Sequence, residues 1–219
     1  MPFKYKLLVV FFSLGIMMIG FGTFSLISPD FDFNFFAAND EEDIASSATF
    51  GAIRIVEGKS KNDILSELDE LIERYFHAKQ EVDMDTIAQC VSNVKHVDEK
   101  KLLTESAYVE GYENIQCKVM NGISTGAYRV YVYYDVKVYD IDTLIPSLNA
   151  LYVKQNEKGE FEVYLGKLDS MEQKYIDRLD ESEKVQALVK SVQNQLEDVV
   201  SADREVRDFY EMLEGVKED

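Results

Sequence analysis

Tryptophan is absent from the 219 residues, and cysteine, histidine and proline are scarce, with two, two and three copies. Two cysteines cannot form a disulfide framework or a multi-cysteine zinc site, and two histidines exclude a histidine-rich metal centre. Basic residues are also few: 23 Lys and Arg stand against 41 Asp and Glu, a formal net charge of −18. This excess of negative charge repels phosphate backbones and anionic lipid head groups, so no nucleic-acid partner is predicted.

One long stretch, residues 7–27, has no charged side chain. Its 21 residues, LLVVFFSLGIMMIGFGTFSLI, would make a helix of about 30 Å, the thickness of the hydrocarbon core of a bilayer. Lys4 and Lys6 precede it and the first charges after it are acidic, so the positive-inside rule places the N-terminus in the cytoplasm. The sequence therefore predicts a cytoplasmic tail over 1–6, a transmembrane helix over 7–27 and a remainder outside the cytoplasm. A cleaved signal peptide is the alternative, although its apolar region is usually only about 7–15 residues long.

Residues 28–59 are predicted to be a tether. Phenylalanines alternate with acidic and amide side chains over 31–36, and an acidic run follows over 40–43. This order is typical of an aromatic belt at the membrane interface followed by a solvated spacer. Beyond residue 27 the chain holds 21 basic and 41 acidic side chains, a net charge of −20.

Helices are predicted first in the folded part. From Ser60 onward, apolar residues recur every three or four positions, as in an amphipathic helix. Ser60 is the expected N-cap, with Asp63 in the first turn. A second helix is expected to begin at Asp83 or Asp85, and a third, short one to span 98–105.

The apolar period then changes to two, which predicts strands at 115–119, 128–139, about 148–155 and 161–165. Neighbouring strands joined by short turns form an antiparallel meander. The longest strand is rich in Val and Tyr and has no internal Gly. Its two faces carry Tyr128, Val130, Val132, Tyr134, Val136 and Val138, and Arg129, Tyr131, Tyr133, Asp135, Lys137 and Tyr139. Because the second face mixes both signs of charge, we interpret it as a solvated surface with cross-strand ion pairs.

The segment 169–219 is predicted to be a helical extension. Ser170 and Gln173 match a capping box, and Asp180 and Glu183 repeat that pattern. A break is expected at the acidic residue in position 203.

These helices share an apolar stripe that is too long to remain in water. Its members are Val185, Leu188, Val192, Leu196, Val199, Val206, Tyr210 and Leu213. Acidic residues beside the stripe would crowd the seam of a dimer. We therefore expect the domain's own sheet to cover it.

Three segments carry a resemblance to a known family. LIERYFHAKQEVDMDTIAQCVSN, YRVYVYYDVKVYD and EFEVYLGKLD resemble the opening helices and closing strands of nuclear transport factor 2-like domains. Over residues 60–168, the resemblance implies an α+β cone in which a curved antiparallel sheet wraps around the first helix and leaves a hollow. A short tail, one membrane helix and such a domain also resemble the assembly-factor proteins of type IV secretion and conjugation machines.

Enzymes of that family use a carboxylate or His base and a Tyr or acid donor inside the cone. Tyr131, Tyr133 and Asp135 offer these chemical types and are weak catalytic candidates. His77 and His96 have no second His or Cys three or four residues away, so no metal site is predicted, and no cofactor either.

Cys90 and Cys117 are each predicted to lie on an apolar face. We expect two separate buried thiols, because free cysteine behaves as a small hydrophobe. A single disulfide between them is the alternative, since the domain is predicted to lie outside the cytoplasm.

The expected function follows from the predicted anchor and from the lack of an assembled catalytic set. We expect a single-pass protein of a bacterial cell membrane whose acidic domain binds a protein partner without catalysis. The missing N-x-S/T sequon favours a bacterial origin. Two alternatives stay open: a structural subunit of a secretion or conjugation complex, and an enzyme catalysing proton transfer on a small carbonyl compound.

Overall fold

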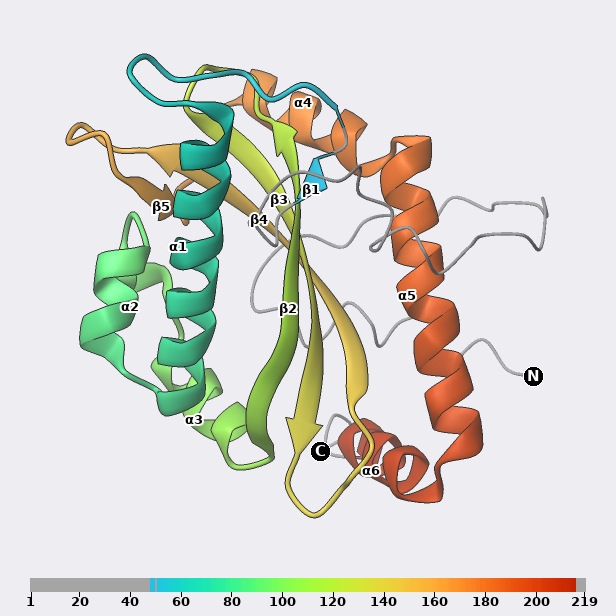
Figure 1. Cartoon of the computed structure of the whole chain (residues 1–219). Helices are drawn as coiled ribbons and strands as arrows, with labels where there is room; N and C mark the ends of the chain where they lie inside the picture. The colour runs from blue at the N-terminus through green and yellow to red at the C-terminus, as the bar shows by residue number, and fades with distance from the viewer. Residues whose placement is uncertain (1–47, 50, 216–219) are drawn as a thin grey trace.

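The structure is a computed structural model that describes residues 48–49 and 51–215 (Figure 1). These residues form an α+β fold in which helices cover both faces of one curved sheet. The predicted transmembrane helix, residues 7–27, lies outside the described residues. Within the described part of the chain, no helix combines the length and the apolar character needed to cross a bilayer.

The sheet confirms the predicted antiparallel meander. Its strands are β2 (Val109–Asn121), β3 (Ala127–Val138), β4 (Ile145–Gln155) and β5 (Phe161–Val163), in that spatial order. β2 begins six residues earlier than predicted, because polar positions at its start hid the alternation. A two-residue strand, β1 (Ala48–Thr49), pairs in parallel with the outer edge of β2.

The segment between β1 and the first helix is bound to the end of the sheet. The Arg54 backbone N–H donates to Asn121 Oδ1 (2.6 Å), and Asn121 Nδ2 donates to the carbonyl of Ala52 (2.8 Å). The Tyr128 hydroxyl donates to the carbonyl of Arg54 (2.7 Å). Contacts with the sheet thus begin well before Ser60, where the folded part was predicted to start.

Four helical segments lie on the first face of the sheet: α1 (Lys61–Glu81), α2 (Met84–Cys90), a 3-10 helix (Val94–His96) and α3 (Glu99–Ser106). The predicted N-cap of α1 is confirmed: the Ser60 hydroxyl accepts from the Asp63 N–H. The Asp63 carboxylate accepts from the Ser60 N–H in return, so the structure adds a capping box that was not predicted. The α1 helix is long enough to run along much of the sheet (Figure 1).

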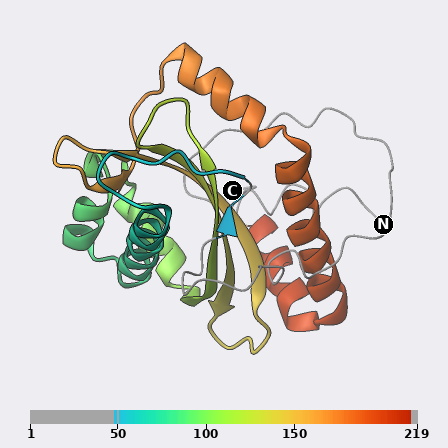
Figure 2. The same ribbon diagram turned by 45° about the horizontal axis from the view of Figure 1, so that its top comes forward.

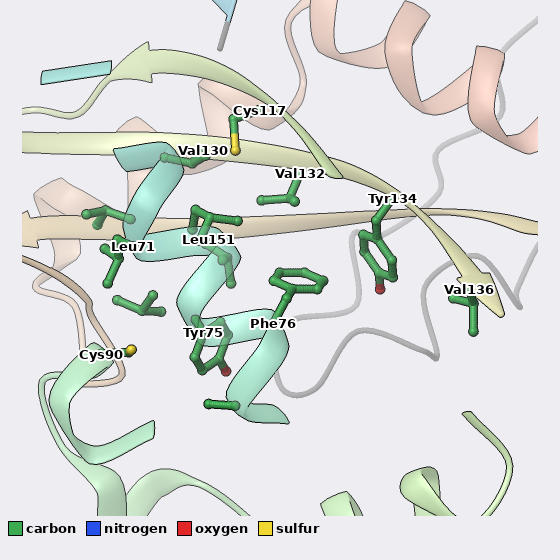
Figure 3. Close-up of a cluster of buried hydrophobic side chains, with 14 of the residues drawn as sticks. Leu71, Tyr75, Phe76, Cys90, Cys117, Val130, Val132, Tyr134, Val136 and Leu151 are labelled. Carbon is green, nitrogen blue, oxygen red and sulfur yellow. The ribbon is translucent and has the colours of Figure 1, made fainter. Parts of the chain in front are cut away.

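The main core lies between α1 and the face of β3 that begins with Tyr128, as predicted (Figure 3). Tyr128, Val130 and Val132 are fully buried there. Successive strand side chains point to opposite faces, so every second residue of β3 enters this core.

Three helices follow the sheet: α4 (Ser170–Asp180), α5 (Glu183–Ala202) and α6 (Arg204–Gly215). The predicted capping box at Ser170 is wrong. The N-cap of α4 is Asp169, whose Oδ1 accepts from the N–H groups of Met171 and Glu172. A carboxylate one residue upstream competes successfully with the serine hydroxyl, because it carries full charge at the positive end of the helix dipole.

The α5 helix lies along the second face of β3 and β4 (Figure 2). Val185, Leu188 and Val192 are buried against Tyr131, so the prediction that the domain's own sheet covers the stripe is confirmed. The interpretation of this face as solvated is wrong for Arg129 and Tyr131, which are each 2% exposed.

The predicted break between α5 and α6 is confirmed at Asp203, whose Oδ1 accepts from the N–H groups of Glu205 and Val206. The α6 helix turns across the end of the sheet (Figure 1). Its residues Phe209 and Tyr210 are buried in the main core.

Candidate functional site

The three predicted catalytic residues all lie on the second face of β3, away from α1. The Tyr133 hydroxyl donates to Asp135 Oδ1 (2.8 Å), so the structure brings these two together. The Tyr131 hydroxyl donates instead to Asp180 Oδ1 (2.7 Å). None of the three is among the residues that line the surface depressions described below.

A buried ion pair occupies the second face beside Tyr131. Arg129 Nε and Nη2 donate to the two carboxylate oxygens of Asp180 (3.0 and 2.6 Å), a bidentate arrangement. Arg129 Nη1 donates to the carbonyl of Ala150 (3.1 Å). Burial raises the pKa of Tyr131, and the adjacent negative charge of Asp180 raises it further.

Asp180 was expected to cap the following helix, and this expectation is wrong. It is the last residue of α4, and α5 starts after Ser182, which makes no side-chain capping bond. The carboxylate faces the sheet because Arg129 offers it two charge-assisted hydrogen bonds in place of one capping bond. The pair ties the corner between α4 and α5 to β3.

Tyr133 and Asp135 form the second polar group on this face. Asn114 Nδ2 donates to Asp135 Oδ2 (2.7 Å) from a left-handed position (φ 51°) within an irregularity of β2. Burial raises the pKa of Tyr133, and its hydrogen bond to Asp135 raises it further. A phenol with a raised pKa stays protonated, so Tyr133 serves as a hydrogen-bond donor rather than a base.

The most unusual group in the interior is Lys79, which sequence reasoning missed. This residue of α1 is only 3% exposed. Its Nζ lies 5.8, 5.2 and 5.3 Å from the ring centroids of Tyr75, Phe76 and Tyr112, within the range of cation–π attraction. Burial lowers the pKa of Lys79 to about 8, with Glu105 opposing the shift.

Glu105 of α3 shares the electrostatics of this interior cluster. Burial raises its pKa, while Lys79 and then Lys101 lower it. A half-buried acid, a buried base and several phenols thus lie near one another beside α1, and these are the chemical types that proton transfer requires.

Aromatic rings pack against one another beside this cluster, and Figure 3 shows two of them, Phe76 and Tyr134. The ring of Phe76 lies 5.3 Å from that of Tyr112 and 4.7 Å from that of Tyr134, and the two tyrosine rings are 5.5 Å apart. Edge-to-face packing at these separations is that of a protein core. Here side chains fill the space between α1 and the sheet, where the family resemblance implied a hollow.

Two open depressions mark the described surface. One, of about 270 Å³, lies between α1 and the irregular part of β2 and includes His77, Tyr112 and Asn114. The other, of about 680 Å³, lies between α1, α2 and the β4–β5 turn, and it carries both Arg74 and Glu70. Ligand pockets are usually enclosed and largely apolar, and neither depression has that character.

The histidines and cysteines play local roles. His77 Nδ1 lies 3.5 Å from Glu81 Oε2 at the surface, and His96 Nδ1 contacts the carbonyl of Leu165. Cys90 and Cys117 are both buried and are not joined by a disulfide. Among the described residues, no three His, Cys, Asp or Glu side chains form a group that could hold a metal ion.

Comparison of the chain with protein-family models, with curated proteins and with solved structures finds no match. The resemblance to nuclear transport factor 2-like domains therefore stays a prediction. Function has to be argued from the geometry of the described residues and from the pattern of the whole sequence.

Proposed function

We propose that the chain is a single-pass membrane protein of a bacterium, anchored through residues 7–27, whose folded domain lies outside the cytoplasm and binds a protein partner. The support for the anchor is the uncharged run of 21 residues preceded by Lys4 and Lys6, which fits the positive-inside rule. About twenty residues separate this run from β1, enough to hold the domain clear of the bilayer surface.

One observation favours binding over catalysis: groups that could act as acid or base are engaged in structural contacts. The hydroxyl of Tyr131 and the carboxylate of Asp180 are committed to a buried ion pair with Arg129. Such a pair is strongly destabilised when one partner is lost. Groups that hold a helix corner in place are poor agents of proton transfer, since the reaction would have to break the contacts that they maintain.

We also propose that the domain is a nuclear transport factor 2-like cone. The order of three helices followed by an antiparallel meander supports this assignment, as does the position of α1 across the curved sheet. Members of a fold differ widely in function. The assignment therefore concerns the shape of the domain and does not identify its partner.

Labelling of single introduced cysteines tests the topology, because both native thiols are buried and give little background. We place one cysteine in the exposed β4–β5 turn (Glu157→Cys) and, as the matched control, one before the apolar run that leaves both lysines in place (Tyr5→Cys). A membrane-impermeant maleimide should label Glu157→Cys in intact bacterial cells and Tyr5→Cys only after permeabilisation. The reverse pattern would refute the proposal. Release of labelled Glu157→Cys protein into the soluble extracytoplasmic fraction would establish the cleaved signal peptide instead.

A further inference from the structure

We propose that the partner docks at the end of the domain where α3, α6 and the start of β2 meet, through an apolar segment flanked by Lys or Arg. This inference rests on the proposed function and adds the surface and the chemistry of the partner. The surface, called here the end patch, consists of the side chains of Tyr108, Tyr139 and Met212, with Phe209 beneath them.

The end patch gathers apolar side chains from three separate elements. Tyr108 is 37% exposed, Tyr139 50% and Met212 42%. The Tyr139 N–H donates to the carbonyl of Tyr108 (3.0 Å), so the two tyrosines are cross-strand neighbours. The ring of Phe209 lies 6.3 Å from that of Tyr108, and Met212 follows Phe209 by three residues on the same face of α6.

Other exposed apolar residues do not form such a group. Met171 is an exposed residue of α4, and Ile55 is an exposed residue of the segment between β1 and α1. Both α4 and β1 lie at the opposite end of the molecule from α6 (Figure 1). Scattered single residues of this kind are normal on protein surfaces. Leu103 of α3 is exposed at the same end as the patch, which extends the apolar character of that end.

Acidic residues border the end patch. Glu110, Asp140 and Glu211 are exposed and follow or precede its members closely in the chain. None of the three forms an ion pair within the described part of the chain. The basic residues Lys101, Lys137 and Arg204 at this end are each paired, with Glu105 (4.0 Å), Asp142 (3.9 Å) and Asp208 (3.4 Å). An apolar centre with a polar rim is the usual anatomy of a protein interface.

The negative charge of these bordering residues favours a partner that carries basic side chains. Two copies of the chain would bring two acidic rims together, and like charges facing one another across an interface are costly. An anionic lipid surface would be repelled in the same way. A partner segment with apolar side chains between basic ones would satisfy both the centre and the rim. The α6 helix, which carries Met212, lies at the opposite end of the sheet from β1 (Figure 1).

Site-specific photo-crosslinking tests the inference in the full chain in bacterial membranes. The photoreactive residue p-benzoylphenylalanine replaces Tyr139 in one variant and, as a matched control, the exposed apolar Met171 in another. We expect a discrete adduct from position 139 and none from 171. The crosslinked peptide, identified by mass spectrometry, should carry apolar residues flanked by Lys or Arg.

Binding by the identified partner is then measured with the purified full chain in detergent. We expect Tyr139→Ser with Met212→Ser to weaken binding at least tenfold, and Asp140→Lys with Glu211→Lys to weaken it and to reduce its salt dependence. Met171→Ser should leave affinity unchanged. These residues are exposed, and the near-ultraviolet circular dichroism of each variant checks that the fold is intact.

Each other outcome contradicts a different claim. An adduct from 171 alone would overturn the docking surface while leaving the proposed binding function in place. An adduct between two copies at position 139 would establish self-association and overturn the charge argument. Absence of an adduct from both positions, or maleimide labelling that places the domain in the cytoplasm, would count against the proposed function itself.

Discussion

The two faces of β3 are stabilised by different interactions, although they belong to one strand. On the first face, Val130, Val132 and Tyr134 pack against α1 in a continuous apolar core. On the second face, a small apolar cluster around Tyr131 and Leu188 lies beside a buried ion pair. The first face gains stability from apolar area and close packing. The second depends in addition on a charged group that is tolerated only because its partner is present.

The comparison teaches that a mixed polar strand face does not indicate solvent. The buried guanidinium of Arg129 would be read as a surface group from β3 alone. Its carboxylate partner comes from a helix about fifty residues later in the chain, and only this contact decides that the face is covered.

Phe76→Ala should cause the largest loss of stability, since it empties the middle of the first face. The side chain is fully buried between the rings of Tyr112 and Tyr134. Truncation of a buried Phe loses its burial and leaves a cavity, which typically costs about 3–5 kcal/mol. Urea unfolding of the full chain in detergent, followed by tyrosine near-ultraviolet circular dichroism, measures the change. A cost below about 1 kcal/mol would contradict the packing described for this face.

Asp180→Leu should destabilise the second face by about 3 kcal/mol, because it leaves the Arg129 guanidinium buried without its carboxylate. The double variant Arg129→Met with Asp180→Leu should be more stable than the single one, since no buried charge remains. The same unfolding experiment compares the two. The single variant Arg129→Met completes the comparison. If the double variant loses as much free energy of unfolding as Asp180→Leu and Arg129→Met lose together, the pair does not act as one unit.

Lys79→Met should stabilise the protein at pH 7, because the first face then no longer holds a buried cation. In the folded state the pKa of Lys79 is lowered to about 8, whereas in the unfolded state it is ordinary. Below pH 8 the lysine is charged in both states and the full burial cost opposes folding. As the pH rises from about 8 to 10.5, the folded state loses this proton first, so wild-type stability increases.

The gain in Lys79→Met should therefore be about 2 kcal/mol at pH 7, should be much smaller at pH 10 and should vanish above about pH 10.5. Glu105→Gln is the control, because it removes the nearby carboxylate, which Lys79 helps to keep ionised, and leaves the buried lysine in place. A gain that is the same at pH 7 and pH 10 would show that the charge of Lys79 does not cause it.

Ser60→Ala should have the smallest effect, a loss of about 1 kcal/mol from the N-cap of α1. Ser170→Ala is the matched control, because Ser170 lies within α4 and the cap there is Asp169. Ser170→Ala should change the free energy of unfolding by less than about 0.5 kcal/mol. Equal losses from both serines would mean that the two helices are capped in the same way.

The first face could be predicted from the sequence because its signals are local. Alternation over β3, the period of α1 and the Ser60 cap are each set by residues close together in the chain. The turn at Gly159 is of the same kind, since its left-handed φ of 82° favours glycine.

The second face and the interior cluster could not be predicted, because their signals are distant or ambiguous. The pairing of Arg129 with Asp180 joins residues 51 positions apart, and no spacing rule reports it. Lys79 follows an amphipathic pattern that allows either a snorkelling surface lysine or a buried one. Whether it is buried depends on the positions of Tyr112 and α3, which are set by the tertiary fold.

The small strand β1 has a mechanical consequence under the proposed anchoring. Residues 28–47 alone then span the gap between the bilayer and the sheet, a contour of about 70 Å when fully extended. If β1 and the bonds of Ala52 and Arg54 to the sheet were pulled apart, residues 48–60 would add roughly 45 Å. Under the proposed anchoring, the short parallel pairing of β1 with β2 would be among the first contacts loaded by a pull away from the membrane. A partner that pulls on the far end of the domain could lengthen its reach from the membrane without unfolding the core.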